Sequence, residues 1–134
     1  MIMNIIEKCC HDFYLHVAKL FYAIAFIDGE IREEEYLSLK ETLRKEWLQK
    51  RQGKEELVAS IIACFEQLRK DEKKAVDCFQ EFVAYKNKHE QLFSNTMKSM
   101  IWEVSCEIAD AVRKKNKSEL IILARLGKQL GIMK

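Results

Sequence analysis

The chain contains no proline, and only four of its 134 residues are glycine. These two residues most often end helices and form turns, so their scarcity permits long helices and disfavours an all-β fold, which needs many turns. Hydrophobic residues make up 49% of the chain and charged residues 33%, a balance typical of a globular protein with its own core. We therefore predict an all-α fold.

Apolar residues recur at helical spacing in six segments of the chain. The first stripe runs from Ile6 to Ile27, and the second helix begins near Glu33 and ends before Gly53. The remaining stripes run from Leu57 or Val58 to Leu68, from Ala75 to Tyr85, from Leu92 to Val112 and from Leu120 to Leu130. We expect the third and fourth helices to be short antiparallel neighbours, with Asp71 as the N-cap between them. Because no linker or low-complexity segment appears, residues 1–134 are predicted to form a single-domain bundle of about six helices.

A helix break and an acidic restart occupy residues 27–35, where the sequence reads Ile-Asp-Gly-Glu-Ile-Arg-Glu-Glu-Glu. Gly29 follows the last apolar position of the first stripe and is predicted to be the left-handed residue that ends the helix. A weaker copy of this pattern follows the fifth stripe, where Asn116 and Glu119 can form a capping box at the start of the sixth helix. Helices 1 and 2 therefore match helices 5 and 6, which indicates a weak internal duplication.

The segment Asp28-Gly29-Glu30-Ile31 followed by Glu35, at the end of an apolar helix, resembles the TerB-like domain. Members of that family have a helix ending in Ala-Asp-Gly and then a helix with Glu in its first turn. Ile27 replaces the alanine here, and the second copy has Ala111 in place of glycine. The resemblance implies a duplicated helical bundle, and the family is associated with tellurite resistance, stress responses and proposed metal sensing.

The acidic turns carry the candidate metal ligands. Carboxylate oxygens are the ligands that Ca²⁺ and Mg²⁺ prefer, although acidic residues in a first helical turn are also expected from the helix dipole alone. The spacing differs from that of an EF-hand loop. If the two halves pack about a pseudo-twofold axis, one shared site for a divalent cation would consist of Asp28, Glu30, Glu35, Asp110 and Glu119.

The cysteines and the charge balance exclude several other functions. The chain has five cysteines, an odd number that includes adjacent Cys9 and Cys10, so a disulfide framework is not expected and reduced thiols indicate the cytoplasm. Cys10 lies on the apolar stripe, and His11 and His16 are five residues apart, so neither a soft-metal site nor a Cys–His nucleophile is expected. The net charge of +2 and the lack of aromatic residues among the basic clusters argue against nucleic-acid binding. No apolar run approaches the ~20 residues of a transmembrane helix.

We therefore expect a non-enzymatic TerB-like helical module that binds a protein partner or a divalent cation, within a stress response if the resemblance holds. The alternative is a metal-dependent enzyme that uses the acidic turn residues. A homodimer is a further hypothesis, with Met100 and Trp102 as candidate interface residues.

Overall fold

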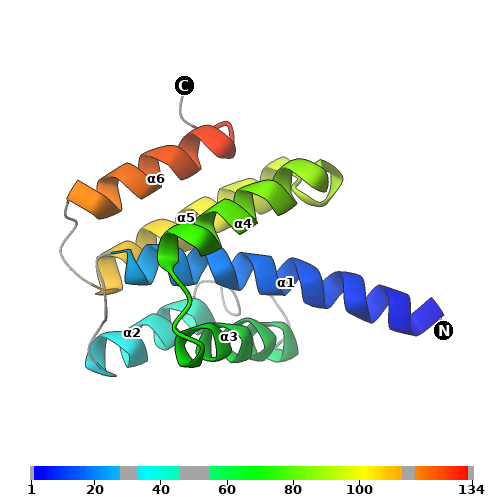
Figure 1. Ribbon diagram of the computed structural model, residues 1–134, viewed down its shortest axis with the longest axis horizontal. Coiled ribbons are helices and arrows are strands. Elements are labelled where there is room, and N and C mark those ends of the chain that lie inside the picture. The colour runs from blue at the N-terminus through cyan, green and yellow to red at the C-terminus, as the bar shows by residue number, and fades with distance from the viewer. Residues whose placement is uncertain (1, 28–32, 46–54, 113–116, 133–134) are drawn as a thin grey trace.

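The computed structural model describes residues 2–27, 33–45, 55–112 and 117–132 of the chain. Within these ranges the structure is a helical bundle without strands, as predicted (Figure 1). Its helices are α1 (Ile2–Phe26), α2 (Glu33–Leu43), α3 (Glu55–Lys70), α4 (Ala75–Lys88), the short 3₁₀ helix η2 (Glu90–Leu92), α5 (Asn95–Val112) and α6 (Lys117–Gln129). The predicted helix-ending roles of Gly29 and Gly53 and the predicted capping role of Asn116 lie outside the described residues.

Helix α1 forms the centre of the bundle, and α3, α4, α5 and α6 all pack against it. From Val17 to Ala25 every residue except Lys19 is buried, so this part of α1 is covered on all sides. Lys19 is the one charged residue of this segment. Its ammonium group lies 3.0 Å from the carboxylate of Glu81 on α4, with which it forms an ion pair. The sequence predicted a single buried stripe on this helix, and the structure instead buries its whole circumference.

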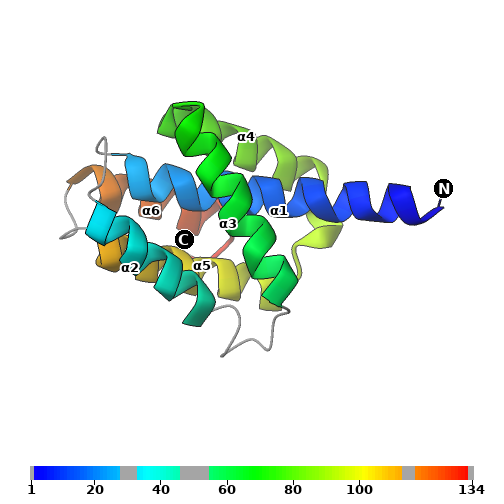
Figure 2. The same cartoon turned by 90° about the horizontal axis from the view of Figure 1, so that it is seen from below.

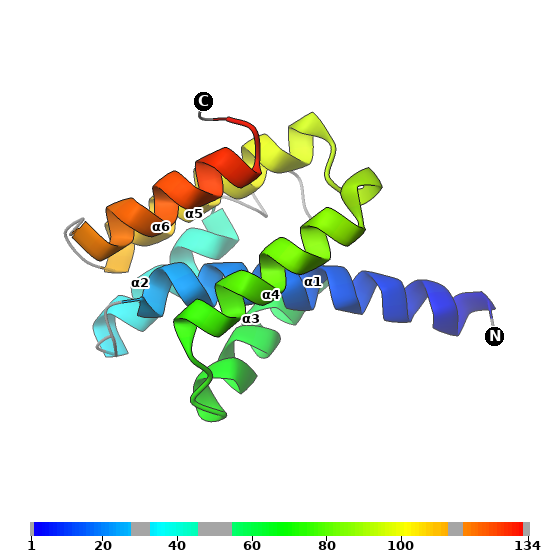
Figure 3. The same ribbon diagram turned by 45° about the horizontal axis from the view of Figure 1, so that its top comes forward.

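The other helices surround α1 in two groups. Helix α2 lies beside α5, and α6 packs on α5 and also contacts α1 (Figure 2). Helices α3 and α4 each pack mainly against α1 and diverge from the turn that joins them (Figure 3). The expectation that α3 and α4 are antiparallel neighbours is therefore wrong, because each buries its apolar face on α1.

Stacked and edge-on aromatic rings join α1, α2 and α3. The ring of Phe65 on α3 lies 5.5 Å from that of Tyr22, 5.8 Å from that of Phe26 and 5.6 Å from that of Tyr36. Such aromatic pairs add to the free energy gained from burial alone. The aromatic cluster fixes α2 and α3 relative to the C-terminal half of α1.

Two helices end in the same hydrogen-bonded motif, with a left-handed residue just after the helix. At the end of α6, Gly131 has φ of +72°, and the amide of Ile132 donates to the carbonyl of Gly127. At the end of α3, Glu72 takes the same position with φ of +55°, and the amide of Lys73 donates to the carbonyl of Leu68. These are Schellman ends, which usually contain glycine at the left-handed position.

The N-cap prediction for Asp71 is wrong. Asp71 closes the end of α3, where its carboxylate accepts a 3.0 Å hydrogen bond from the side-chain amide of Gln67. The N-cap of α4 is Lys74, whose side chain makes no capping hydrogen bond. The start of α4 is therefore set by its packing on α1 rather than by a polar cap.

Four apolar residues have a different environment from the predicted one. Leu92 lies in η2 and is exposed, and the neighbouring Phe93 is buried in its place. On α6, Leu120 is 52% exposed, whereas Ile122 joins Leu123, Leu126 and Leu130 in the core. The apolar stripe of α6 therefore begins two residues later than the sequence predicted.

Candidate functional site

The structure describes only part of the predicted cation site. Asp28 and Glu30 lie outside the described residues. Glu35 and Glu119 lie in the first turns of α2 and α6, in segments where the backbone but not these side chains is described. Asp110 lies near the end of α5 and is exposed. Among the described residues, no three His, Cys, Asp or Glu side chains are grouped so that they could hold a metal ion.

The described helix ends that flank the two acidic turns lie at the same end of the bundle. Helices α1 and α5 end there, and α2 and α6 begin there (Figures 1 and 2). The hypothesis of one site shared by both turns requires this arrangement. The site itself remains a prediction, because its ligands are not placed.

A different feature of the described surface is a groove between the side chains of α4 and α6, the two helices that face the viewer in Figure 3. Two adjoining hollows of about 240 and 590 Å³ form it. The α4 wall consists of Val76, Phe79, Gln80, Val83, Ala84 and Asn87. The α6 wall consists of Ser118, Ile121, Ile122, Arg125, Lys128 and Gln129. We call these two walls, with Ile27 at one end, the α4–α6 groove.

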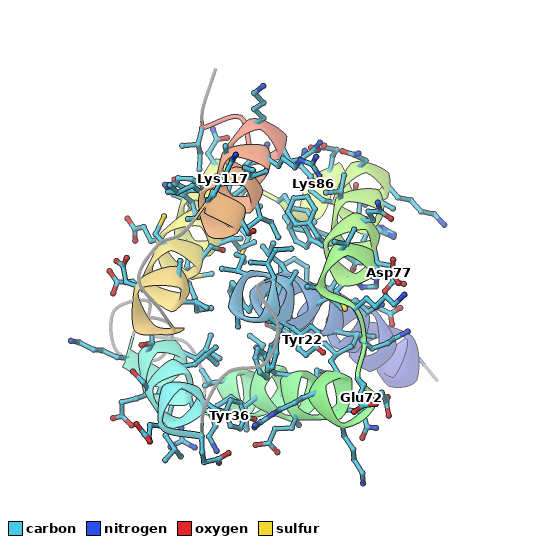
Figure 4. All side chains as sticks on the ribbon, turned by 60° about the vertical axis from the view of Figure 1, so that its left-hand side comes forward. Tyr22, Tyr36, Glu72, Asp77, Lys86 and Lys117 are labelled. Atoms are coloured by element: carbon cyan, nitrogen blue, oxygen red, sulfur yellow. The ribbon has the colours of Figure 1, made fainter. Side chains whose placement is uncertain are left out.

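A third hollow, of about 540 Å³, continues the groove around the start of α4 and shares Ile27 and Val76 with it. We call this the turn hollow, because the turn between α3 and α4 forms its rim. The phenolic hydroxyl of Tyr22, whose ring lies between α1 and α3 in Figure 4, donates a 2.6 Å hydrogen bond to the carbonyl of Lys73 in this turn. The turn is thus tied to the central helix, and the rim of the hollow has a fixed position.

The groove exposes apolar side chains that a bundle core would normally cover. Val76 on the α4 wall is 52% exposed, and Ile121 on the α6 wall is 48% exposed. Phe79 and Ile122 lie beneath them and are buried. Apolar residues exposed on facing walls of one groove are typical of a surface that binds another molecule.

The charged residues that line the three hollows are mostly basic. They are Arg69, Lys73 and Lys74 around the turn hollow, Arg125 and Lys128 along α6, and the single carboxylate of Glu72. Arg69 already lies over the ring of Tyr36 and 3.6 Å from Glu33. Neither Arg125 nor Lys128 forms an ion pair with a carboxylate in the described part of the chain. The α4–α6 groove therefore combines an apolar floor with unneutralised positive charge.

The two buried thiols in the described part of the chain lack the properties of catalytic nucleophiles. Cys64 and Cys78 are free and buried. Burial raises the pKa of the Cys64 thiol, and burial together with the nearby Glu81 carboxylate raises the pKa of Cys78 to about 11. Since the thiolate is the reactive form, both groups are inert at neutral pH.

His16 is held in a structural contact. Its ring stacks on that of Tyr85 with centroids 4.0 Å apart, and its Nδ1–H donates a 2.7 Å hydrogen bond to the carbonyl of Asp12. The two interface residues suggested for a homodimer both pack against the core of the bundle. Met100 is buried, and Trp102 is partly buried against the core.

The α4–α6 groove was not predicted from the sequence, although one feature of the sequence indicates it. Residues 120–123 are four consecutive apolar residues, Leu-Ile-Ile-Leu, in α6. Consecutive residues of a helix point in directions about 100° apart, so four in a row cannot all face one core. At least one of them had to be exposed or to line a second surface.

None of the helices in the described ranges is long and apolar enough to span a membrane. No family model matches the chain, and neither a curated protein nor a solved structure shows significant similarity to it.

Proposed function

We propose that this chain is a non-enzymatic, TerB-like helical module that binds a protein partner through the α4–α6 groove. The observation that carries the proposal is the exposure of Val76 and Ile121 on facing walls of one groove. Burying such side chains under a partner gives about 25 cal/mol for each Å² of apolar surface removed from water.

The shape of the groove favours a protein segment over a small molecule. Three hollows adjoin one another through shared residues, from Tyr22 at one end to Gln129 at the other. Pockets for small molecules typically enclose most of their ligand in one cavity. An elongated row of hollows suits an extended or helical segment of another protein.

The thiol chemistry supports a binding role rather than catalysis. An enzyme needs a nucleophile or an acid–base group with a suitable pKa, and burial makes Cys64 and Cys78 unreactive. The alternative function, a metal-dependent enzyme, would use the acidic turns and not the groove.

A partner-binding experiment tests the proposal. The tagged chain would be used to capture proteins from the source cells. Each captured protein would be identified and purified, and its affinity for the chain would be measured by isothermal titration. Ile121→Asp should abolish the binding of a true partner, because a carboxylate would enter the apolar floor. Leu37→Asp is the matched control, since Leu37 is 54% exposed on α2 and lines none of the three hollows. Equal binding by wild type and Ile121→Asp would overturn the proposal.

A second candidate function is divalent cation binding at the end of the bundle where α1 and α5 end and α2 and α6 begin, which the common position of these four helix ends favours. Titration with Ca²⁺, Mg²⁺, Mn²⁺ and Zn²⁺ tests it directly. Binding should be lost in the variant that combines Asp28→Asn with Glu35→Gln. An absence of binding below millimolar concentration, or binding unchanged in that variant, would reject a cation site.

A further inference from the structure

We propose that the occupant of the α4–α6 groove is an acidic amphipathic helix of about three turns, with its apolar face on Val76, Phe79 and Ile121 and its carboxylates facing Arg125 and Lys128. This inference rests on the proposed function and names the class of partner.

The walls of the groove have the spacing of helix surfaces that receive another helix. The α4 wall follows positions 76, 79, 80, 83, 84 and 87, and the α6 wall follows positions 118, 121, 122, 125, 128 and 129. Both sets begin with the pattern i, i+3, i+4 and i+7, so the residues of each wall share one face of their helix. Rows at these spacings form the ridges and grooves into which the side chains of a third helix pack.

The length of the walls sets the length of the occupant. Each wall spans eleven residue steps, from Val76 to Asn87 and from Ser118 to Gln129. At about 1.5 Å per residue this is roughly 16 Å, or about three helical turns. An occupant of this length carries apolar anchors at i, i+3 or i+4, and i+7, and the apolar floor of the groove has room for all three.

The charges select an acidic helix. Arg125 lines both hollows of the groove, and Lys128 lies one turn further along α6. At the other end, Lys74 and Lys73 line the turn hollow. Among the described side chains, the nearby acidic groups are Glu72, on the rim of the turn hollow, and Asp77, exposed on α4, whereas Glu81 is already paired with Lys19. Positive charge therefore dominates the groove, and complementary potentials favour an acidic partner.

A second copy of this chain fits the groove less well. Within the described part of the chain, the acidic helix that it could offer is α2, where Glu33, Glu34 and Glu41 are exposed with Leu37 as the one large exposed apolar residue. One apolar anchor would leave most of the floor uncovered. A separate protein with three anchors is the better match.

Fluorescence anisotropy with synthetic helices tests the inference. The probe is a labelled peptide of about 14 residues with leucine at the three anchor positions and glutamate on both flanks, and the comparison peptide has lysine in place of glutamate. The full chain should bind the acidic peptide at least about tenfold more tightly than the basic one. Affinity for the acidic peptide should fall as the salt concentration rises from about 50 to about 300 mM.

Charge-reversal variants locate the binding site. The double variant Arg125→Glu with Lys128→Glu should weaken binding of the acidic peptide by about tenfold or more, because like charges would then face each other. The matched control, Arg44→Glu with Lys45→Glu, makes the same change in net charge at exposed positions outside the groove and should leave the affinity unchanged. Amide shifts in ¹H–¹⁵N spectra should be confined to α4, α6 and the turn between α3 and α4.

Several outcomes would overturn the inference. Equal affinity for the acidic and basic peptides would reject the charge selection, and shifts on other helices would reject the site. Light scattering that shows a dimer, abolished by Ile121→Asp, would make a second copy the occupant. If a natural partner requires Ile121 but no acidic helix binds, the proposed function stands and this inference fails. If neither the natural partner nor the acidic peptide requires Ile121 for binding, the proposed function and this inference both fail.

Discussion

The hydroxyl of Tyr22 donates a 2.6 Å hydrogen bond to the backbone carbonyl of Lys73, a residue 51 positions further along the chain. Tyr22 lies on the central helix α1, and Lys73 lies in the turn between α3 and α4. This single bond connects the central helix to the point where α3 and α4 diverge. It therefore sets the direction in which α4 leaves the turn, and with it the position of the α4 wall of the groove.

The first prediction concerns this bond. Tyr22→Phe should lower the free energy of unfolding by about 1 kcal/mol, because it removes the donor and leaves a partly buried carbonyl unpaired. Tyr36→Phe is the matched control, since the Tyr36 hydroxyl is buried near the carboxylate of Glu66 without a hydrogen bond of full geometry in the described structure. Urea denaturation of both variants checks the pair. Equal losses in the two would mean that the bond to Lys73 contributes nothing.

The second prediction concerns Glu72, which holds a left-handed conformation with φ of +55°. Glu72→Gly should raise the free energy of unfolding by about 0.5 to 1 kcal/mol, because glycine adopts this conformation without strain from a Cβ atom. Lys70→Gly, two residues earlier and in the last turn of α3, should instead lower it by up to about 1 kcal/mol. Thermal denaturation of the two variants should give shifts of opposite sign. A loss of stability in Glu72→Gly would contradict the assigned turn.

The sequence was sufficient to predict the six helices, because each one carries an apolar stripe with helical spacing and no proline interrupts it. Periodicity does not show how many neighbours a helix has. Residues 17–25 of α1 were read as one stripe, yet Ala18, Ala23 and Ala25 are buried on the other faces. Small residues there permit close approach of several helices, and only the tertiary arrangement shows that the neighbours are present.

The groove was beyond prediction for a related reason. Its walls come from segments more than 30 residues apart, and neither wall has an unusual motif. Val76 and Ile121 each look like an ordinary apolar residue near the start of a helix. Helix α4 packs on α1, while α6 packs on α5 and α1. Helices α4 and α6 therefore face each other without packing closely together, and Val76 and Ile121 are exposed.

The third prediction compares two leucines of α6. Leu126 is fully buried, so Leu126→Ala should lower the free energy of unfolding by about 2 to 5 kcal/mol through lost burial and a residual cavity. Leu120 belongs to the same predicted stripe but is exposed, and Leu120→Ala should change stability by no more than about 0.5 kcal/mol. Chemical denaturation of both variants measures the difference. Similar losses would mean that the stripe begins at Leu120, as the sequence indicated.

The fourth prediction is a dependence of stability on pH that comes from His16. Burial and the nearby charge of Lys19 lower the pKa of His16 below its ordinary value of 6.5, against the opposing effects of the Asp12 carbonyl and the carboxylates of Asp12 and Glu81. Below pH 6.5 the unfolded chain therefore binds a proton at this position more readily than the folded chain does. Stability rises with pH wherever the unfolded state binds more protons, so the contribution of His16 is complete above pH 6.5 and is lost as the pH falls through the lowered pKa.

The variant His16→Phe isolates this effect, because phenylalanine keeps the ring that stacks on Tyr85 and cannot take up a proton. Urea denaturation at a series of pH values from about 8 to about 5 should show a steeper loss of stability on acidification for the wild type than for His16→Phe. The two curves should run parallel above pH 6.5, where the unfolded histidine is also mostly neutral. Parallel curves across the whole range would mean that the imidazole can be protonated in place. The contact between α1 and α4 at Tyr85 would then tolerate a charged ring, contrary to the burial that lowers its pKa.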